Sequence, residues 1–250
     1  MDDSDLAADL VRDAGTLAAK MLADGLETHY KTSVSDVVSA ADHAAEERVL
    51  SRLIEHRPDD GVVGEEGASR PGRRTWYIDP VDGTYNFLNQ IPYWCSAIGL
   101  AQDELPVVGA VYYPAMDELW VGGPDRPTTR NAVPVPTLED QPLERISVCT
   151  YLHPNRFDDA DMFEPWRAVI AATATIRMLG SASIDLSGVA TGRSGLFLQK
   201  NLNLWDWLPG AALVQGAGGV AEIFPHRGQS WNLAGSAQAV AEAKALILGC

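Results

Sequence analysis

Asp79 and Asp82 are the residues of this chain best suited to bind a metal ion. They lie in residues 76–84, at the end of an apolar run, and enclose a Pro-Val pair. Proline fixes its own φ and turns the chain, so the two carboxylates can converge on a hard cation. The N–H groups of Gly83 and Thr84 follow and can meet an anion such as phosphate. The stretch predicts a metal and phosphate site, although Asp, Pro and Gly also form ordinary turns.

Two further acidic groups lie far from this stretch in the sequence. Glu65 and Glu66 follow a short apolar run that ends at Gly64, and Asp206 stands between two tryptophans just before a predicted helix. An isolated acidic pair is usually solvated surface, and Asp206 is expected to be the N-cap of its helix. Each group is also an oxygen donor that could complete the same metal site.

The composition is that of an ordinary globular protein and argues against several functions. The 250 residues can form one large domain or two small ones, with 46% hydrophobic and 21% charged residues. A net charge of -15 without a basic run disfavours nucleic acid as a ligand. Three cysteines without paired spacing argue against disulfides and a thiolate zinc site, and fit a reducing cytoplasm. The start of the chain resembles no signal peptide, and no apolar run approaches about 18 residues, so neither secretion nor a membrane span is expected.

The apolar pattern predicts two helices, then a run of strands, then an alternation of both, which favours a layered architecture. The predicted helices cover 5–22, 39–58, 162–172, 183–191, 209–216 and 238–248. The predicted strands cover 61–64, 75–78, 93–100, 107–113, 118–121, 146–151, 175–178, 195–198 and 220–224. Residues 122–145, with five prolines, predict a long loop and a domain boundary.

Three motifs together resemble the signatures of the inositol monophosphatase family. They are Gly64-Glu65-Glu66, the pattern W-x-I-D-P-x-D-G-T over 76–84, and Trp205-Asp206 followed by P-G-A at 209–211. The D-P-x-D-G-T core alone would match by chance on the order of once in ten thousand chains of this length.

The resemblance extends over essentially the whole chain. The spacing of Lys31, Asp36 and Asp42 is similar to the family's K-x-x-x-x-D-x-V-T-x-x-D segment. Residues 177–182 are similar to its R-x-x-G-S/T-A segment. The resemblance implies a mixed α/β fold, an αβαβα sandwich of the inositol monophosphatase and fructose-1,6-bisphosphatase type. We divide it into an N-terminal α+β part, 1–140, and a C-terminal α/β part, 141–250, that completes the site.

The family's chemistry is the hydrolysis of a small phosphate monoester by metal-activated water, dependent on magnesium and sensitive to lithium. The resemblance implies two or three Mg²⁺ ions, with Mn²⁺ as a possible substitute, and a homodimer. The composition adds the expectation of a cytoplasmic protein that binds neither nucleic acid nor membrane. The implied metal ligands are Glu65, Asp79, the Val81 carbonyl, Asp82 and Asp206. The implied catalytic residues, which orient the water, are Glu65, Thr84 and Asp42. The implied phosphate and substrate contacts are Asp82, Gly83, Thr84, Ser181, Ala182 and Gln199.

The substrate contacts depart from the family pattern. Seven residues before Asp206 the family carries a Glu that binds inositol hydroxyls, whereas this chain has Gln199. The family's hairpin over 122–145 is expected to be a rebuilt loop, and His153 and Arg156 are candidate specificity residues. The substrate is therefore predicted as an inositol, cyclitol or sugar monophosphate, with histidinol phosphate or a bisphosphate nucleotide or sugar as alternatives. For a bisphosphate the plausible cations are Lys200, Arg156 and Arg177. A regulatory protein-binding role with an intact phosphatase site is the alternative of another class.

Overall fold

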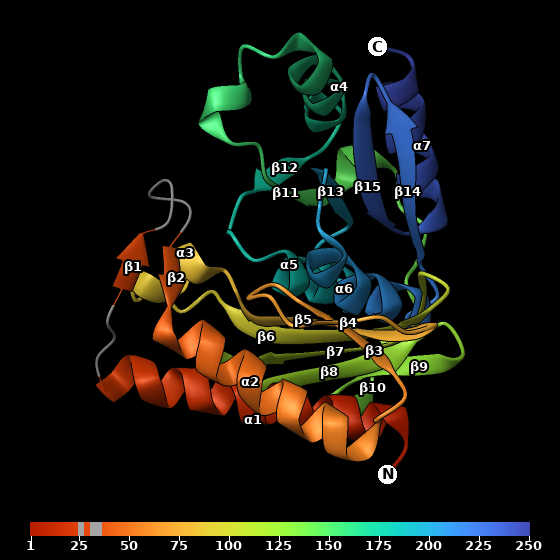
Figure 1. Ribbon diagram of the computed structural model, residues 1–250. Helices are drawn as coiled ribbons and strands as arrows, with labels where there is room; N and C mark the ends of the chain where they lie inside the picture. Colours follow the sequence, from red (N-terminus) through yellow and green to blue (C-terminus); the bar gives the residue numbers. More distant parts are fainter. Residues whose placement is uncertain (25–27, 31–36) are drawn as a thin grey trace.

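The computed structural model describes residues 1–24, 28–30 and 37–250, and in it helices and sheets are stacked in layers (Figure 1). The helices are α1 (Asp3–Asp24), α2 (Ala40–His56), α3 (Thr84–Leu88), α4 (Ala160–Ala171), α5 (Ala182–Ala190), α6 (Leu204–Gly216) and α7 (Ala237–Leu248). The first sheet contains β3 (Gly61–Gly64), β4 (Ser69–Arg70), β5 (Arg74–Asp82), β6 (Cys95–Gln102), β7 (Leu105–Tyr113), β8 (Glu118–Gly123), β9 (Arg126–Arg130) and β10 (Val133–Pro134). The second sheet contains β11 (Ser147–Thr150), β12 (Thr175–Arg177), β13 (Leu196–Lys200), β14 (Val220–His226) and β15 (Gln229–Gly235). Strands β1 (Thr28–Tyr30) and β2 (Val37–Ser39) form a separate antiparallel pair.

The layers run helix, sheet, helix, sheet, helix (Figure 1). Helices α1 and α2 cover one face of the first sheet, and α5 and α6 lie between the two sheets. Helices α4 and α7 cover the outer face of the second sheet. This arrangement confirms the αβαβα sandwich expected from the sequence, whereas the division at residue 140 stays a prediction.

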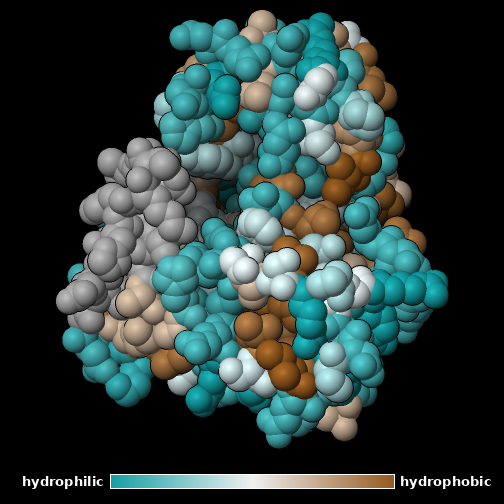
Figure 2. All heavy atoms as spheres, in the orientation of Figure 1, coloured by the Kyte–Doolittle hydropathy of each residue, from teal (hydrophilic) through white to brown (hydrophobic). Residues whose placement is uncertain are grey.

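Apolar side chains fill the interfaces between the layers, because the helices bury apolar side chains against the sheets. Leu6 and Leu10 of α1 pack with Trp76 and Ile78 of β5 beneath the first sheet. Helices α5 and α6 contribute to a core that both sheets share. Hydrophilic residues cover much of the face in Figure 2. None of the helices that the structure describes is long and apolar enough to span a bilayer.

Strand β5 lies inside the first sheet, parallel to β3 and antiparallel to β6. The order of the sheet is β10-β9-β8-β7-β6-β5-β3-β4. Residues 79 and 82 and the turn after β3 are therefore at the same end of neighbouring parallel strands. This pairing brings the first two acidic motifs together.

The expectation of a long, rebuilt loop over 122–145 is wrong in its first part. Strand β9 pairs antiparallel with β8, with Gly123 opposite Arg126, and β10 adds a short edge strand. Thr128 of β9 is fully buried, and its hydroxyl donates to the Leu213 carbonyl of α6 at 2.6 Å. The prolines and glycines suggested a loop, but proline is tolerated at a sheet edge and this hairpin lies there. Strand β15, which was not predicted, likewise pairs with β13 and β14.

Replacing Thr128 by Ala should lower the free energy of unfolding by about 2 kcal/mol, because a buried hydrogen bond and a buried methyl group are both lost. The corresponding fall in melting temperature, measured by calorimetry, is about 5 °C. Thr129→Ala is the matched control, since Thr129 is less buried and its bond to the Val121 carbonyl is 3.3 Å long. Equal losses in the two variants would contradict the role assigned to Thr128.

Candidate active site

A bulge in β5 turns both aspartates of the central motif to the same face of the sheet. Asp79 lies opposite Ala97 of β6 and Asp82 lies opposite Cys95, so three steps along β5 match two steps along β6. Residues three apart in a regular strand point to opposite faces, and one extra residue reverses this relation. Both carboxylates therefore face the layer of α5 and α6.

Pro80 occupies the bulge, where its missing N–H costs no ladder hydrogen bond. Its carbonyl accepts a hydrogen bond from the buried Ser96 hydroxyl at 2.5 Å. The expectation that the strand ends before Asp79 and that Pro80 starts a turn is wrong. Pairing with β6 resumes after the bulge, so the strand continues to Asp82.

Asp206 reaches the site from α6, on the opposite side. This helix begins at Leu204 and has Asn203 as its N-cap, so the expected start at Pro209 and the N-cap role of Asp206 are both wrong. Proline is common at the first helical position, which favoured that start. The helix extends further because residues such as Trp207 bury their side chains in the core shared by the two sheets. Asp206 lies in the first turn of α6.

The second turn of α6 lies almost directly on the first sheet. A Cβ atom on Gly109 of β7 would come within 2.0 Å of the Pro209 carbonyl oxygen, and one on Gly99 of β6 within 3.0 Å of the Pro209 nitrogen. Only glycine allows this approach of helix and strand backbones. The close contact fixes how far Asp206 stands from β5.

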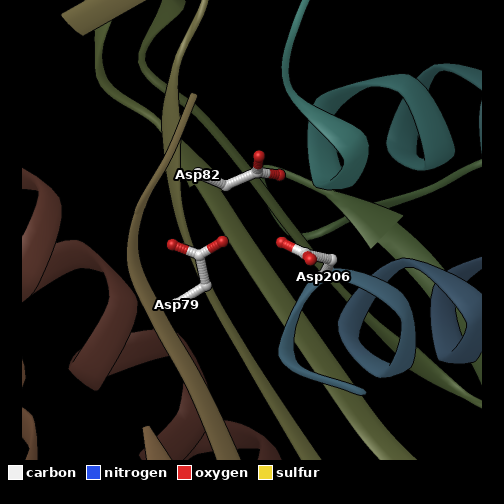
Figure 3. A group of neighbouring side chains, drawn as sticks. All are labelled: Asp79, Asp82 and Asp206. Atoms are coloured by element: carbon white, nitrogen blue, oxygen red, sulfur yellow. The ribbon is translucent and has the colours of Figure 1, made fainter. Parts of the chain in front are cut away.

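Asp79, Asp82 and Asp206 point toward one another (Figure 3). One carboxylate oxygen from each lies within 4.8 Å of the other two. Oδ1 of Asp79 is buried and has no hydrogen-bond partner among the described residues. A buried carboxylate oxygen without a partner is unfavourable, and a cation held by the three groups would satisfy it. A donor set made only of oxygens fits Mg²⁺ or Mn²⁺ better than Zn²⁺.

The pKa values of these carboxyl groups are raised, which reflects their burial and mutual repulsion. Burial, followed by the charges of Glu65 and Asp82, raises the pKa of Asp79 well above its usual range. Burial, followed by the charge of Asp82, raises the pKa of Asp206 to about 7. Burial also raises the pKa of Asp82, and hydrogen bonds from Ser183 oppose this shift. A bound cation would remove the repulsion that these shifts record.

Glu65 lies beside the three aspartates but outside the group whose carboxylate oxygens are all within 4.8 Å of one another. It follows the last residue of β3, and its pKa is raised to about 8 by loss of hydration and then by the charge of Asp206. The residue as a whole is exposed, although its carboxyl group lies beside the carboxyl group of Asp79. Asp42 of α2 is 1% exposed and lies near enough for its charge to raise the pKa of Glu65 further. Lys31 and Asp36 lie outside the described residues.

Thr84 and Val81 meet at the end of β5. The Thr84 hydroxyl donates a hydrogen bond to the Val81 carbonyl at 3.0 Å, so its lone pairs remain able to accept one from water. Gly83 between them has φ 101, the left-handed conformation that favours glycine, and it caps the short helix α3. The sequence of the loop thus aims the Thr84 hydroxyl at the backbone of the metal-binding motif.

The start of α5 contacts Asp82 directly. The carboxylate of Asp82 accepts hydrogen bonds from the N–H groups of Ala182 at 3.2 Å and Ser183 at 2.5 Å. Ser181 is the N-cap of the helix, and its hydroxyl accepts from the Ile184 N–H. The Ala182 N–H is therefore engaged by Asp82, and Ser181 holds the helix end in place.

Asn86 joins the same two segments, although the sequence patterns did not point to it. Its side-chain nitrogen donates to the carbonyls of Tyr93 and Leu179, both at 2.8 Å, and the residue is 8% exposed. These bonds tie α3 to the chain before α5. The sequence marked it only as a polar residue two positions after Thr84, where the motif ends.

A groove of about 890 Å³ opens beside the acidic cluster. The predicted contacts Ser181, Ala182 and Gln199 line it, together with His153, whereas Arg156 does not. No lysine or arginine is among the described residues that line it. Its other walls are largely aromatic and apolar and include Tyr85, Tyr151, Met178 and Leu179. The groove can therefore hold a phosphate ester against the acidic cluster.

Residues 3–246 match the model of the inositol monophosphatase family. The chain belongs to the inositol monophosphatase family. Inositol monophosphatase 1 of Solanum lycopersicum is 31% identical over 238 residues, which cover 91% of this chain and 86% of that protein. Inositol-1-monophosphatase of Mesorhizobium japonicum is 35% identical over 191 residues, which cover 74% of this chain and 71% of the relative.

Solved structures show the same fold. The extragenic suppressor protein suhB of Bartonella henselae superposes with a TM-score of 0.87 at 26% identity and covers 97% of both chains. Inositol monophosphatase of Anabaena superposes with a TM-score of 0.83 at 27% identity and covers 98% of this chain and 95% of that one. The expected family, fold and enzyme class are confirmed: the chain is a phosphoric monoester hydrolase of a metal-dependent phosphatase family.

Without metal, the protein should lose stability as the pH rises from 5 to 8. The folded pKa values of about 8 for Glu65 and about 7 for Asp206 exceed the ordinary 4.5 and 3.8, so the folded state binds more protons in this window. Stability is then highest at pH values below the ordinary pKa values, and it falls until the pH exceeds the pKa values of the folded state. Calorimetric melting in chelator should show this fall, and Mg²⁺ at pH 8 should reverse it.

Asp206→Asn should flatten this pH profile, because it removes one of the repelling charges. Asp125→Asn is the control, since Asp125 is an exposed residue in the turn between β8 and β9. An identical profile in wild type and Asp206→Asn would contradict the electrostatic account.

Proposed function

We propose that this enzyme hydrolyses the monophosphate ester of an uncharged polyol, such as inositol, another cyclitol or a sugar, with Mg²⁺ as its cofactor. The observation that carries the proposal is the cluster of three carboxylates within 4.8 Å of one another beside the groove, with Oδ1 of Asp79 left without a partner among the described residues. The family membership supports the reaction class. The names of the relatives support an inositol phosphate as the first substrate to test.

The metal ligands that we propose are Glu65, Asp79, the Val81 carbonyl, Asp82 and Asp206. They are all oxygen donors and would hold two Mg²⁺ ions, with a third and looser one near Glu65. Magnesium bound there would neutralise phosphate oxygens and lower the pKa of a water molecule for in-line attack. Mn²⁺ would substitute, because it accepts the same ligands.

Thr84, Glu65 and Asp42 would position the attacking water. The Thr84 hydroxyl donates a hydrogen bond to the Val81 carbonyl, so its oxygen can accept a hydrogen bond from that water. The Glu65 carboxylate would accept a second hydrogen bond from the same water. Asp42 is buried near Glu65, close enough for their charges to interact, and would support its position. The backbone at Gly83 and Thr84 would bind the phosphate.

The walls of the groove favour an uncharged leaving group. Gln199 is neutral, which disfavours an ammonium-bearing ester such as histidinol phosphate. Strand alternation places Gln199 on the side of Phe197, in the core shared by the two sheets, and Lys200 on the opposite side with Leu198. Lys200 therefore points away from the groove and cannot serve a second phosphate there. The side-chain amide of Gln199 can both donate to and accept from hydroxyl groups.

The homodimer that the resemblance implies and the cytoplasmic location expected from the cysteines both stay predictions. Light scattering after size-exclusion chromatography measures the first. The substrate proposal does not depend on either.

Phosphate release from a panel of monophosphates should be fastest with cyclitol or sugar monophosphates, should require Mg²⁺ and should be inhibited by lithium. Asp79→Asn should reduce kcat/KM at least about 100-fold, since even partners behind a metal ligand contribute 10- to 100-fold. Measured in chelator, its melting temperature should not fall below that of the wild type, because the substitution removes a group that the neighbouring carboxylates repel. Asp125→Asn is the control and should retain full activity. Absence of turnover of every ester by the wild type would refute the proposed function.

Thr84→Val should lower kcat by about 100-fold or more and leave KM nearly unchanged, because the hydroxyl acts on the water rather than on the leaving group. Thr84→Ser keeps the hydroxyl and should recover most of the rate. Steady-state kinetics on the best ester of the panel measures both values. A loss confined to KM would contradict the role given to Thr84.

A further inference from the structure

Glu46 of α2 holds the turn that carries Glu65, and it has none of the roles described above. Its Oε2 accepts a hydrogen bond from the Glu66 N–H and its Oε1 accepts one from the Ala68 N–H, both at 2.8 Å. The residue is only 5% exposed. A carboxylate that accepts two backbone N–H groups fixes the path of the chain between them.

The end of β3 is shaped to admit this carboxylate. A Cβ atom on Gly64 would lie 2.2 Å from Oε2 of Glu46 and 2.4 Å from its Cδ, so any other residue would displace the carboxylate. The Gly64 N–H donates to the Ala68 carbonyl at 2.8 Å, which closes the turn around the Glu46 side chain. The glycine that precedes Glu65 in the motif is thus explained by Glu46.

Helix α2 presents two buried acidic side chains on the face that covers the site. Asp42 and Glu46 are four residues apart, one helical turn, and both are buried. Asp42 lies close enough to Glu65 for their charges to interact, whereas Glu46 binds the backbone N–H groups of Glu66 and Ala68. The two carboxylates therefore act on the same turn in different ways.

Burying a carboxylate is unfavourable unless its oxygens are matched by donors. Glu46 forms no ion pair with any described residue, and its matched donors are the two N–H groups of the turn. A glutamine of nearly the same shape would present an NH₂ group to one of these N–H groups, and donor would face donor. The site therefore depends on the charge of Glu46 as well as on its shape.

We propose that Glu46 is a positioning residue that fixes the Glu65 turn so that the Glu65 carboxyl group reaches the metal site. The inference rests on the proposed function, because it assigns Glu65 to the metal. Partners behind a metal ligand typically contribute 10- to 100-fold in metal affinity. Glu46 would act on metal binding through Glu65, without touching the substrate.

The test compares Glu46→Gln with Glu47→Gln, its exposed neighbour on the same helix. Glu46→Gln should weaken Mn²⁺ binding, measured by calorimetry, and raise the Mg²⁺ concentration for half-maximal activity, each by about 10-fold or more. KM for the ester at saturating Mg²⁺ should stay within about twofold. Hydrogen exchange at the Glu66 and Ala68 amides should become faster. Glu47→Gln should change none of these values.

Gly64→Ala supplies a second variant that keeps the Glu46 carboxylate and displaces it. It should weaken metal binding and speed the same exchange, and it carries the test if Glu46→Gln does not fold. A lower melting temperature with unchanged metal affinity of the folded protein would overturn the proposal and leave Glu46 a purely structural residue. Metal binding and exchange are measured without substrate, so failure of every ester to react would refute the proposed function and not this inference.

Discussion

One extra residue in β5 is the constraint on which the rest of the site depends. Without the bulge at Pro80, Asp79 and Asp82 would point to opposite faces, and one would enter the apolar core beneath α1 and α2. The Ser96 hydroxyl supports the bulge by donating to the Pro80 carbonyl. The bulge turns Asp79 and Asp82 to one face of the first sheet. The site forms because Asp206, the start of α5 and the Glu65 turn approach these two residues there.

The site concentrates negative charge at a place where the fold would otherwise bury apolar groups. Asp79 and Asp82 are nearly inaccessible to solvent, and the pKa values of the whole group are raised. Such an arrangement is unfavourable for folding and favourable for binding divalent cations. The apolar cores around it, with fully buried side chains such as Trp76 and Phe197, supply the stability that allows it.

The sequence predicted best what short motifs encode. The D-P-x-D-G-T core pointed to Asp79, Asp82 and Thr84, and the spacing of apolar residues found α1, α2 and most strands. The hairpin of β8 and β9 was missed, because its prolines lie at a tolerant sheet edge. Glu46 and Asn86 were missed for another reason: their partners are backbone groups 7 to 93 residues away, and no side-chain pattern marks a backbone partner.

Helix α6 packs against the first sheet on one side and shares a core with the second on the other, and it carries Asp206 at its start. The acidic group is therefore completed only when distant parts of the chain have assembled around this helix. Metal affinity would then report on the completeness of tertiary structure, and nascent or partly unfolded chains would have little capacity to hold the ion. A substitution at the far side of α6, remote from any carboxylate, would then inactivate the enzyme if it changed the distance between α6 and the first sheet.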